Sequence, residues 1–195
     1  LQTVGKTYLA RPENIEKYTN GRFSPTGLAT KATPLKGPEN PPCGTLTHAD
    51  PIDTALATGL LIHDEDTDLT HIIANNLSLR ATATLSSHTT IAPLKAADHV
   101  VVFSQGALRD TLDRLPPKHS APHDVKGFND LLTWAQSHGL KQIITCHAPV
   151  GPIADLLTQV RKPLGEQGIS LTTIMAPYDR MTWPHATHGF FRFKD

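Results

Sequence analysis

The stretch from Gln142 to Leu157 constrains the fold more than any other part of this sequence. It opens with a short apolar, β-branched run, and Pro149 and the pair Gly151–Pro152 then interrupt the chain. Apolar residues recur at helical spacing after this turn, at positions 153, 156, 157 and 160. We therefore predict a buried strand, a tight turn and an amphipathic helix, with Pro152 in the first helical turn.

The turn after this strand is the predicted ligand site. The first N–H groups of a helix have no intrahelical partner, and open α/β sheets bind ligands at the carboxyl ends of their strands. The candidate cofactor-binding residues are His147, Gly151 and Ile153, the last two through their backbone amides. His147 is the best placed histidine for a general base, but the sequence identifies no partner that would orient it, and we interpret it as a hydrogen-bonded structural histidine. Cys146 is interpreted as a small buried apolar residue.

Strands and helices alternate along the chain from residue 60 onward. Besides the central strand, we predict strands over 60–63, 77–85, 97–103 and 169–175, and helices over 104–115, 128–138 and 152–162. A short helix is also expected after Asp50–Pro51. Alternation of this kind predicts an α/β fold with a doubly wound, mainly parallel five-stranded sheet of Rossmann-like type.

The sequence divides into three parts by composition. Residues 1–28 are polar and modestly basic, and apart from a short helix over 13–18 they contain nothing that could form a core. Residues 29–48 are rich in proline and are predicted to be a linker. Residues 49–195 form the α/β domain with an aromatic tail. Basic and aromatic residues in the first part could suit a nucleic acid. We interpret this part instead as a segment that packs on another domain or is exposed to solvent.

The composition excludes several classes of function. Lys plus Arg and Asp plus Glu both number 18, so no overall field attracts nucleic acid or an anionic membrane. No apolar run approaches the roughly 20 residues of a membrane span. The two cysteines form no C-x-x-C or zinc pattern, which favours a cytoplasmic protein with reduced thiols. The sequence contains no phosphate-binding, dinucleotide-binding or serine-hydrolase motif.

The densest acidic stretch runs from His63 to Asp68. Its residues Asp64, Glu65 and Asp66 could bind a divalent cation and serve a metal-dependent hydrolase. However, the stretch lacks the glycine and the distal glutamate of an EF-hand loop. We therefore interpret it as a solvated loop that caps the next helix electrostatically, and we predict no metal site.

The last twenty residues are unusually aromatic. One interpretation is an aromatic pocket beside Trp183 with its neighbouring histidines. The other is a tail that folds over the sheet and buries Phe190, Phe191 and Phe193. The second interpretation explains more residues, and we adopt it as the prediction.

Two stretches resemble a bacterial branch of the photolyase/cryptochrome flavoproteins. They are residues 142–157 and the segment Trp183-Pro-His-Ala-Thr-His-Gly-Phe-Phe-Arg-Phe193. Residues 2–10 and 14–23 resemble the closing part of the helical flavin-binding domain, which precedes the α/β domain in this branch. The resemblance covers most of residues 60–195 loosely and these stretches best. It implies an α/β domain of the photolyase type.

The resemblance implies a light-dependent flavoprotein as the parent of this chain. The parent would be a deoxyribodipyrimidine photolyase, a lyase that repairs pyrimidine dimers in DNA by electron transfer from reduced FAD, or a cryptochrome that senses blue light. FAD and DNA would bind to a helical domain or subunit outside these residues. We therefore expect a C-terminal fragment or a split subunit that alone binds FAD poorly and is inactive. Trp134 and Trp183 match no motif for electron transfer.

An antenna chromophore is not expected to bind tightly. The family carries an acidic-Pro-Tyr turn after the strand, and this sequence has His147-Ala-Pro-Val150 instead. The alternative to a flavoprotein is a non-catalytic α/β module that binds a nucleotide or docks on another subunit. A long helical, tryptophan-rich reading frame upstream of Leu1 would favour the flavoprotein, and a start codon just before Leu1 would favour the module.

Overall fold

The computed structural model describes residues 5, 7–39, 44, 50–73, 77–88, 94–116, 122–187 and 190–194. The chain divides into two compact units, Leu1–Thr45 and Leu46–Asp195. In the first unit, helix α1 (Pro12–Tyr18) forms as predicted and buries no residue. Asn20 and Gly21 follow it with left-handed φ angles of 52° and 72°, which end the helix.

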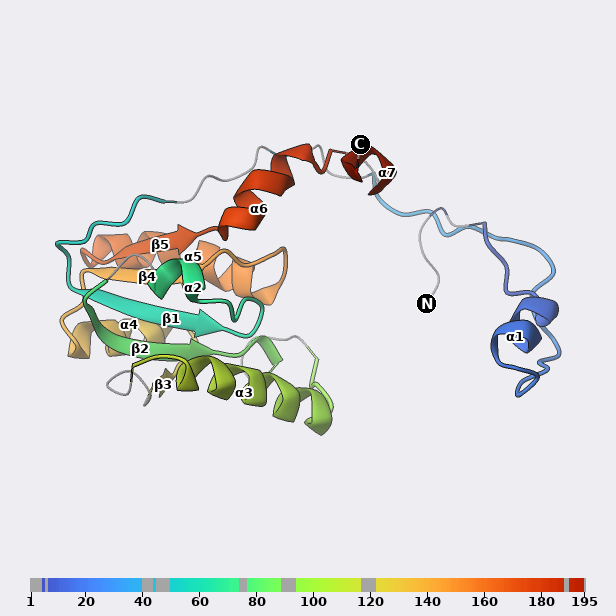
Figure 1. Cartoon of the computed structure of the whole chain (residues 1–195), viewed down its shortest axis with the longest axis horizontal. Helices are drawn as coiled ribbons and strands as arrows, with labels where there is room; N and C mark the ends of the chain where they lie inside the picture. The colour runs from blue at the N-terminus through green and yellow to red at the C-terminus, as the bar shows by residue number, and fades with distance from the viewer. Residues whose placement is uncertain are drawn as a thin grey trace. The chain divides into compact units, whose positions relative to one another are not determined.

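The second unit contains a five-stranded, all-parallel sheet of order β3-β2-β1-β4-β5 (Figure 1). The strands are β1 (Thr58–His63), β2 (Leu79–Leu85), β3 (His123–Asp124), β4 (Gln142–Cys146) and β5 (Ser170–Ile174). The helices between them are α2 (Thr70–Ile73), α3 (Asp98–Asp113), α4 (Phe128–Ser137) and α5 (Pro152–Glu166). The predicted doubly wound α/β class is confirmed, and four of the predicted strands correspond to β1, β2, β4 and β5.

Helices cover both faces of this sheet. On one face, Leu61 belongs to an apolar cluster with Trp134 of α4 and Ile153 of α5. On the other face, Leu60 belongs to a cluster with Leu108 of α3. Successive residues of a strand point to opposite faces, which is why neighbours on β1 enter different clusters. Strands β1 and β4 are buried at every position, as expected for the centre of a doubly covered sheet.

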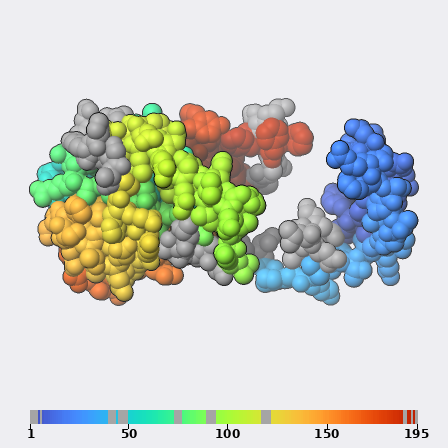
Figure 2. Space-filling model, turned by 90° about the horizontal axis from the view of Figure 1, so that it is seen from below, coloured from blue at the N-terminus to red at the C-terminus, as the bar shows by residue number. Residues whose placement is uncertain are grey.

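The strand predicted over residues 97–103 is wrong. Ala97 is the N-cap of α3, and the residues after it form the start of this helix (yellow-green in Figure 2). Val102 and Phe103 are 67% and 77% exposed. A short apolar run does not by itself distinguish a strand from a helix. The buried positions Leu108 and Leu112 lie one turn apart and hold the whole segment as a helix. The fifth place in the sheet is taken by the two-residue edge strand β3.

The short helix predicted after Asp50–Pro51 does not form either. Residues 51–57 are turn and irregular structure before β1 begins. Asp50 does not cap a helix, because its carboxylate accepts hydrogen bonds from Thr173 and Arg161 instead. A tertiary contact therefore replaces the local one that the sequence indicated.

Helix α5 extends beyond its predicted end at Lys162. It passes through Pro163 and ends at Glu166. A proline inside a helix removes one hydrogen bond and crowds the preceding turn. Leu164 is fully buried in the core beneath α5, so tertiary packing holds the helix through this position.

The aromatic tail does not bury its phenylalanines, contrary to the prediction. The chain ends with α6 (Pro177–Thr182), the 3₁₀ helix η3 (Trp183–His185) and α7 (Phe190–Lys194). Phe190 and Phe191 are 68% and 77% exposed, and Phe193 is 37% exposed. Helices α2 to α5 already cover both faces of the sheet, which leaves no apolar face for the tail. Among the described residues, no helix combines the length and apolar character that a bilayer span requires.

Candidate functional site

Polar side chains gather where β1 and β4 end side by side. These strands pair in parallel from Thr58 and Gln142 to Leu61 and Thr145. The order of the sheet reverses between them, and in doubly wound folds such a switch point opens a crevice at the carboxyl ends of the strands. We refer to His63, Glu65, Thr145 and Gly151, which lie at this end, as the switch-point site.

His63 is fully buried at the last position of β1. Its Nε2 lies 3.0 Å from the carbonyl oxygen of Cys146, and since a carbonyl only accepts, Nε2–H donates. Burial lowers the pKa of His63, although the bond to Cys146 and the carboxylates of Asp66 and Asp64 oppose this effect. The neutral ring leaves Nδ1 as an acceptor, and Nδ1 has no hydrogen-bond partner within the described structure.

Two further buried oxygen atoms lack a partner among the described residues: Oγ1 of Thr145 and Oε2 of Glu65. Thr145 is in register with Leu61, so the period of two places its side chain on the same face of the sheet as His63. Buried polar atoms in folded proteins are nearly always hydrogen-bonded to protein or to ordered water. The unpartnered atoms of the switch-point site therefore indicate that water or a polar group of a ligand binds there.

Glu65 faces the N-terminus of α5. Gly151 is the N-cap of this helix, and a Cβ atom at Gly151 would lie 3.4 Å from Oε1 of Glu65. Burial and the carboxylate of Asp64 raise the pKa of Glu65, and His88 opposes them. A carboxylate beside a helix N-terminus disfavours the binding of a phosphate there, because both are anions. The site thus presents acceptors on His63 and Glu65 and a hydroxyl on Thr145 that both donates and accepts, which suits a neutral polar group better than an anion.

The three predicted cofactor residues have different surroundings. His147 lines a groove of about 380 Å³ beside α5 and β5, and its ring meets that of Trp183 edge-on at a centroid distance of 5.2 Å. Gly151 lies opposite Glu65. The side chain of Ile153 is fully buried in the core, so only its backbone amide can contribute to binding. Sequence reasoning did not identify His63 and Thr145, whose only signal is a polar residue inside a buried strand.

The carboxylates of the acidic stretch diverge. Asp64 accepts hydrogen bonds from Oγ of Ser86 at 2.9 Å and from the N–H of Ser87 at 3.0 Å. Glu65 faces α5, as described above. Asp68 accepts the N–H of Thr70 at 3.0 Å at the start of α2, in keeping with the predicted capping role. The carboxylates of Asp64, Glu65 and Asp66 therefore do not converge on one metal-binding point, as the metal-dependent hydrolase considered above would require.

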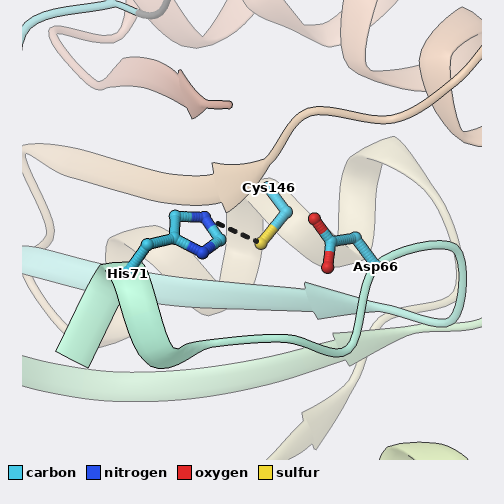
Figure 3. A group of neighbouring side chains, drawn as sticks. All are labelled: Asp66, His71 and Cys146. Atoms are coloured by element: carbon cyan, nitrogen blue, oxygen red, sulfur yellow. Dashed lines mark hydrogen bonds between the residues drawn. The ribbon is translucent and has the colours of Figure 1, made fainter. Parts of the chain in front are cut away.

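Asp66 instead meets two residues that the sequence did not connect with it. Asp66, His71 and Cys146 each offer one ligand atom, and these atoms lie within 4.8 Å of one another. Sγ of Cys146 lies 3.9 Å from Nε2 of His71, and Figure 3 shows the carboxylate of Asp66 on the other side of the sulfur. Cys146 is 2% exposed, and burial, together with Asp66, raises the pKa of its thiol far above the ordinary range. Without a metal, the thiol stays protonated near neutral pH.

The fold and site together define a doubly wound α/β domain with a polar site at its switch point. Comparison with known proteins adds no relative: no family model, no curated protein and no solved structure matches this chain.

Proposed function

We propose that this chain is the α/β part of a cytoplasmic flavoprotein of the photolyase/cryptochrome type. The parent would use light-driven electron transfer from FAD to repair pyrimidine dimers in DNA, or would sense blue light. One observation carries this function. Residues 142–157, which resemble that family, form β4 and the first turns of α5 beside the switch point of a five-stranded parallel sheet. This is the architecture that the resemblance implies.

FAD and DNA then belong to a helical domain or subunit, and residues 2–10 and 14–23 resemble the closing part of that domain. The first unit supports this division, because α1 buries no residue and the side chains of Tyr8 and Tyr18 are 87% and 78% exposed. Large exposed aromatic side chains are typical of a segment that packs against further protein. The α/β unit supplies a docking surface and the switch-point site, and it holds no antenna tightly.

The experiment compares the native polypeptide that contains these residues with the 195-residue chain, both purified in the dark. The native polypeptide is expected to carry stoichiometric FAD, measured by visible absorption after release, and the 195-residue chain is expected to carry none. A native polypeptide without flavin would refute the flavoprotein. Stoichiometric flavin on the 195-residue chain would refute the assignment of FAD to the helical part.

Repair and sensing are separated by one further measurement on the flavin-loaded polypeptide. Loss of pyrimidine dimers from a damaged oligonucleotide under blue light, and not in darkness, identifies a photolyase. A light-induced change in the flavin spectrum without loss of dimers identifies a photoreceptor.

A non-catalytic nucleotide-binding module is the second candidate, and the three unpartnered polar atoms of the switch-point site favour it. Because the Glu65 carboxylate lies beside the N-terminus of α5, such a module would bind the base or the ribose rather than the phosphate. Calorimetry with adenosine and AMP tests this preference. We expect adenosine to bind at least as tightly as AMP and Thr145→Val to weaken this binding. Thr133→Val on the exposed side of α4 is expected to leave binding unchanged. Tighter binding of AMP would contradict this assignment.

A further inference from the structure

Asp66, His71 and Cys146 reach one point from three separate segments. Asp66 lies in the loop after β1, His71 on α2, and Cys146 at the last position of β4. Two local hydrogen bonds hold the loop around Asp66. Oδ1 of Asp66 accepts the N–H of Asp68, and Oδ1 of Asp68 accepts the N–H of Thr70, each at 3.0 Å. The Cα positions of the three residues are thus set by the fold rather than by flexible chain.

Helix α2 is also held in place from beneath. Leu69 and Ile72, which flank His71, are 4% and 1% exposed and belong to the apolar cluster that contains Cys146. On the β4 side, Nε2–H of His63 donates to the main-chain carbonyl of Cys146. Both ends of the cluster therefore rest on buried structure, which is how proteins preorganise metal ligands.

The distances suit one small ion. Two ligands of a tetrahedral zinc ion, one sulfur and one nitrogen, lie about 3.6 Å apart, given bond lengths of roughly 2.3 and 2.05 Å. Sγ of Cys146 and Nε2 of His71 are 3.9 Å apart, so a shift of a few tenths of an ångström closes this pair. The widest separation in the cluster does not exceed 4.8 Å. A side-chain rotation that moves the Asp66 carboxylate by roughly 1.5 Å removes the excess, and it exchanges the hydrogen bond from the Asp68 N–H for the bond to the ion.

We propose that Asp66, His71 and Cys146 bind a divalent ion of the zinc class, with the fourth tetrahedral position taken by water or an external ligand. A thiolate and an imidazole select zinc, cobalt and related ions, whereas magnesium and calcium require oxygen ligands. Cys146 binds as the thiolate, so its proton passes to solvent when the ion enters. This site is independent of the flavoprotein function proposed above.

Cobalt(II) replaces zinc as a spectroscopic probe in the full 195-residue chain. In a Cys43→Ser background, Cys146 is the only thiol. We expect titration with Co²⁺ to produce the visible bands of a tetrahedral ion and a near-ultraviolet thiolate charge-transfer band. The charge-transfer band is expected to vanish in Cys146→Ser, and His71→Asn and Asp66→Asn are each expected to weaken binding by more than about tenfold.

The matched controls lie on the exposed first turn of α3. His99→Asn and Asp98→Asn change the same residue types away from the cluster, and both are expected to bind Co²⁺ like the parent. X-ray absorption of the zinc-loaded parent needs no substitution, and it is expected to find one sulfur at about 2.3 Å with nitrogen and oxygen at about 2.0–2.1 Å. A metal shell without sulfur, or a cobalt spectrum unchanged by Cys146→Ser, would overturn the site.

Discussion

Nη1 of Arg161 on α5 lies 2.9 Å from Oδ2 of Asp50, although 111 residues separate the two in sequence. The same oxygen accepts the N–H and the Oγ1–H of Thr173 on β5, each at 3.0 Å, and the Asp50 N–H donates to the Thr173 carbonyl at 3.1 Å. The segment that leads into the central strand β1 is thereby fastened to the edge strand β5. It covers main-chain groups of β5 that would otherwise form an open edge.

The first prediction concerns this carboxylate. Burial alone would raise the pKa of Asp50, but the hydrogen bonds from Thr173 and Arg161 outweigh it and lower the pKa from 3.8. A carboxyl group whose pKa is lower in the folded state than in the unfolded state stabilises the fold at pH values above the unfolded-state pKa. This stabilisation is lost as the pH falls through the folded-state pKa. The side chain is 35% exposed, so solvent weakens the ion pair.

We therefore expect Asp50→Ala to lower the free energy of unfolding by about 1–2 kcal/mol near neutral pH and by less in acid. Urea unfolding followed by tryptophan fluorescence measures both values. Glu166→Ala, which removes only an exposed contact to Lys162 at 4.0 Å, serves as the control. An equal loss in the control would show that Asp50 has no special role.

Glu65 should show the opposite pH dependence. Its pKa is raised above 4.5 in the folded state by burial and Asp64, so the carboxylate costs stability as the pH rises from 4.5 through the folded pKa. Glu65→Gln is expected to raise the free energy of unfolding near neutral pH and to change it little below pH 4.5. Urea titrations over this range measure the difference against the exposed control Glu166→Gln. A loss of stability at neutral pH would contradict it.

Gly59 of β1 provides a packing prediction. A Cβ atom there would overlap Cδ1 of Leu140 and lie 2.6 Å from Cη2 of Trp134. We expect Gly59→Ala to cost about 1–3 kcal/mol. Trp134→Phe removes the obstructing ring atoms together with an indole N–H that has no described partner. The double variant is therefore expected to lose less unfolding free energy than the sum of the two single losses, by about 1 kcal/mol or more.

Circular dichroism during urea unfolding measures this coupling without relying on the fluorescence of Trp134. Gly106→Ala in α3, where no atom outside the helix lies within 4 Å of the new Cβ, is the matched control and is expected to stabilise by about 0.5–1 kcal/mol. Strict additivity of Gly59→Ala and Trp134→Phe would mean that the two positions do not share space.

Pro163 is the clearest candidate for stabilisation. It lies inside α5, where proline removes a helical hydrogen bond. Pro163→Ala is expected to raise the free energy of unfolding by about 1–3 kcal/mol, measured by thermal or urea unfolding. Pro152→Ala in the first turn of the same helix should bring no gain, because the N–H missing there has no helical partner. Equal effects at both positions would contradict the explanation.

The thiol of Cys146 should be protected by the fold. With 2% exposure and a raised pKa, it is both inaccessible and protonated. In Cys43→Ser protein with chelator present, we expect iodoacetamide to label Cys146 only as fast as the chain unfolds. Mass spectrometry follows the labelling, and the urea-unfolded protein gives the full rate. Native labelling at that full rate would refute the prediction.

The sequence predicts the central part of the fold because β1, β4 and α5 carry continuous or periodic apolar residues that end up buried. It does not predict β3, whose two residues are exposed and polar. Asp130 contacts the start of this strand and the segment just after it: it accepts the Lys126 N–H at 2.8 Å and lies 2.7 Å from Nε2 of His123. Side-chain contacts of this kind leave no periodic signal.

The sequence predicts where the candidate site lies but not which residues form it. Its place after β4 follows from the strand-turn-helix pattern, and His147 and Gly151 do lie there. The meeting of His71 with Cys146 joins residues 75 positions apart and depends on α2 crossing the same end of the sheet. Since the loop after β1 contains several carboxylates, only the fold decides that Asp66 is the one that meets them.

The last two residues of β4 turn to opposite sides, Thr145 toward α5 and Cys146 toward α2. A single peptide unit therefore separates two chemically different half-sites, one offering oxygen acceptors and the other a sulfur ligand. A substitution on one face of the sheet can therefore alter one half-site while the residues around the other half-site stay the same. A register slip of one residue in β4 would exchange the two, so the pairing of this strand with β1 dictates which chemistry each face of the sheet receives.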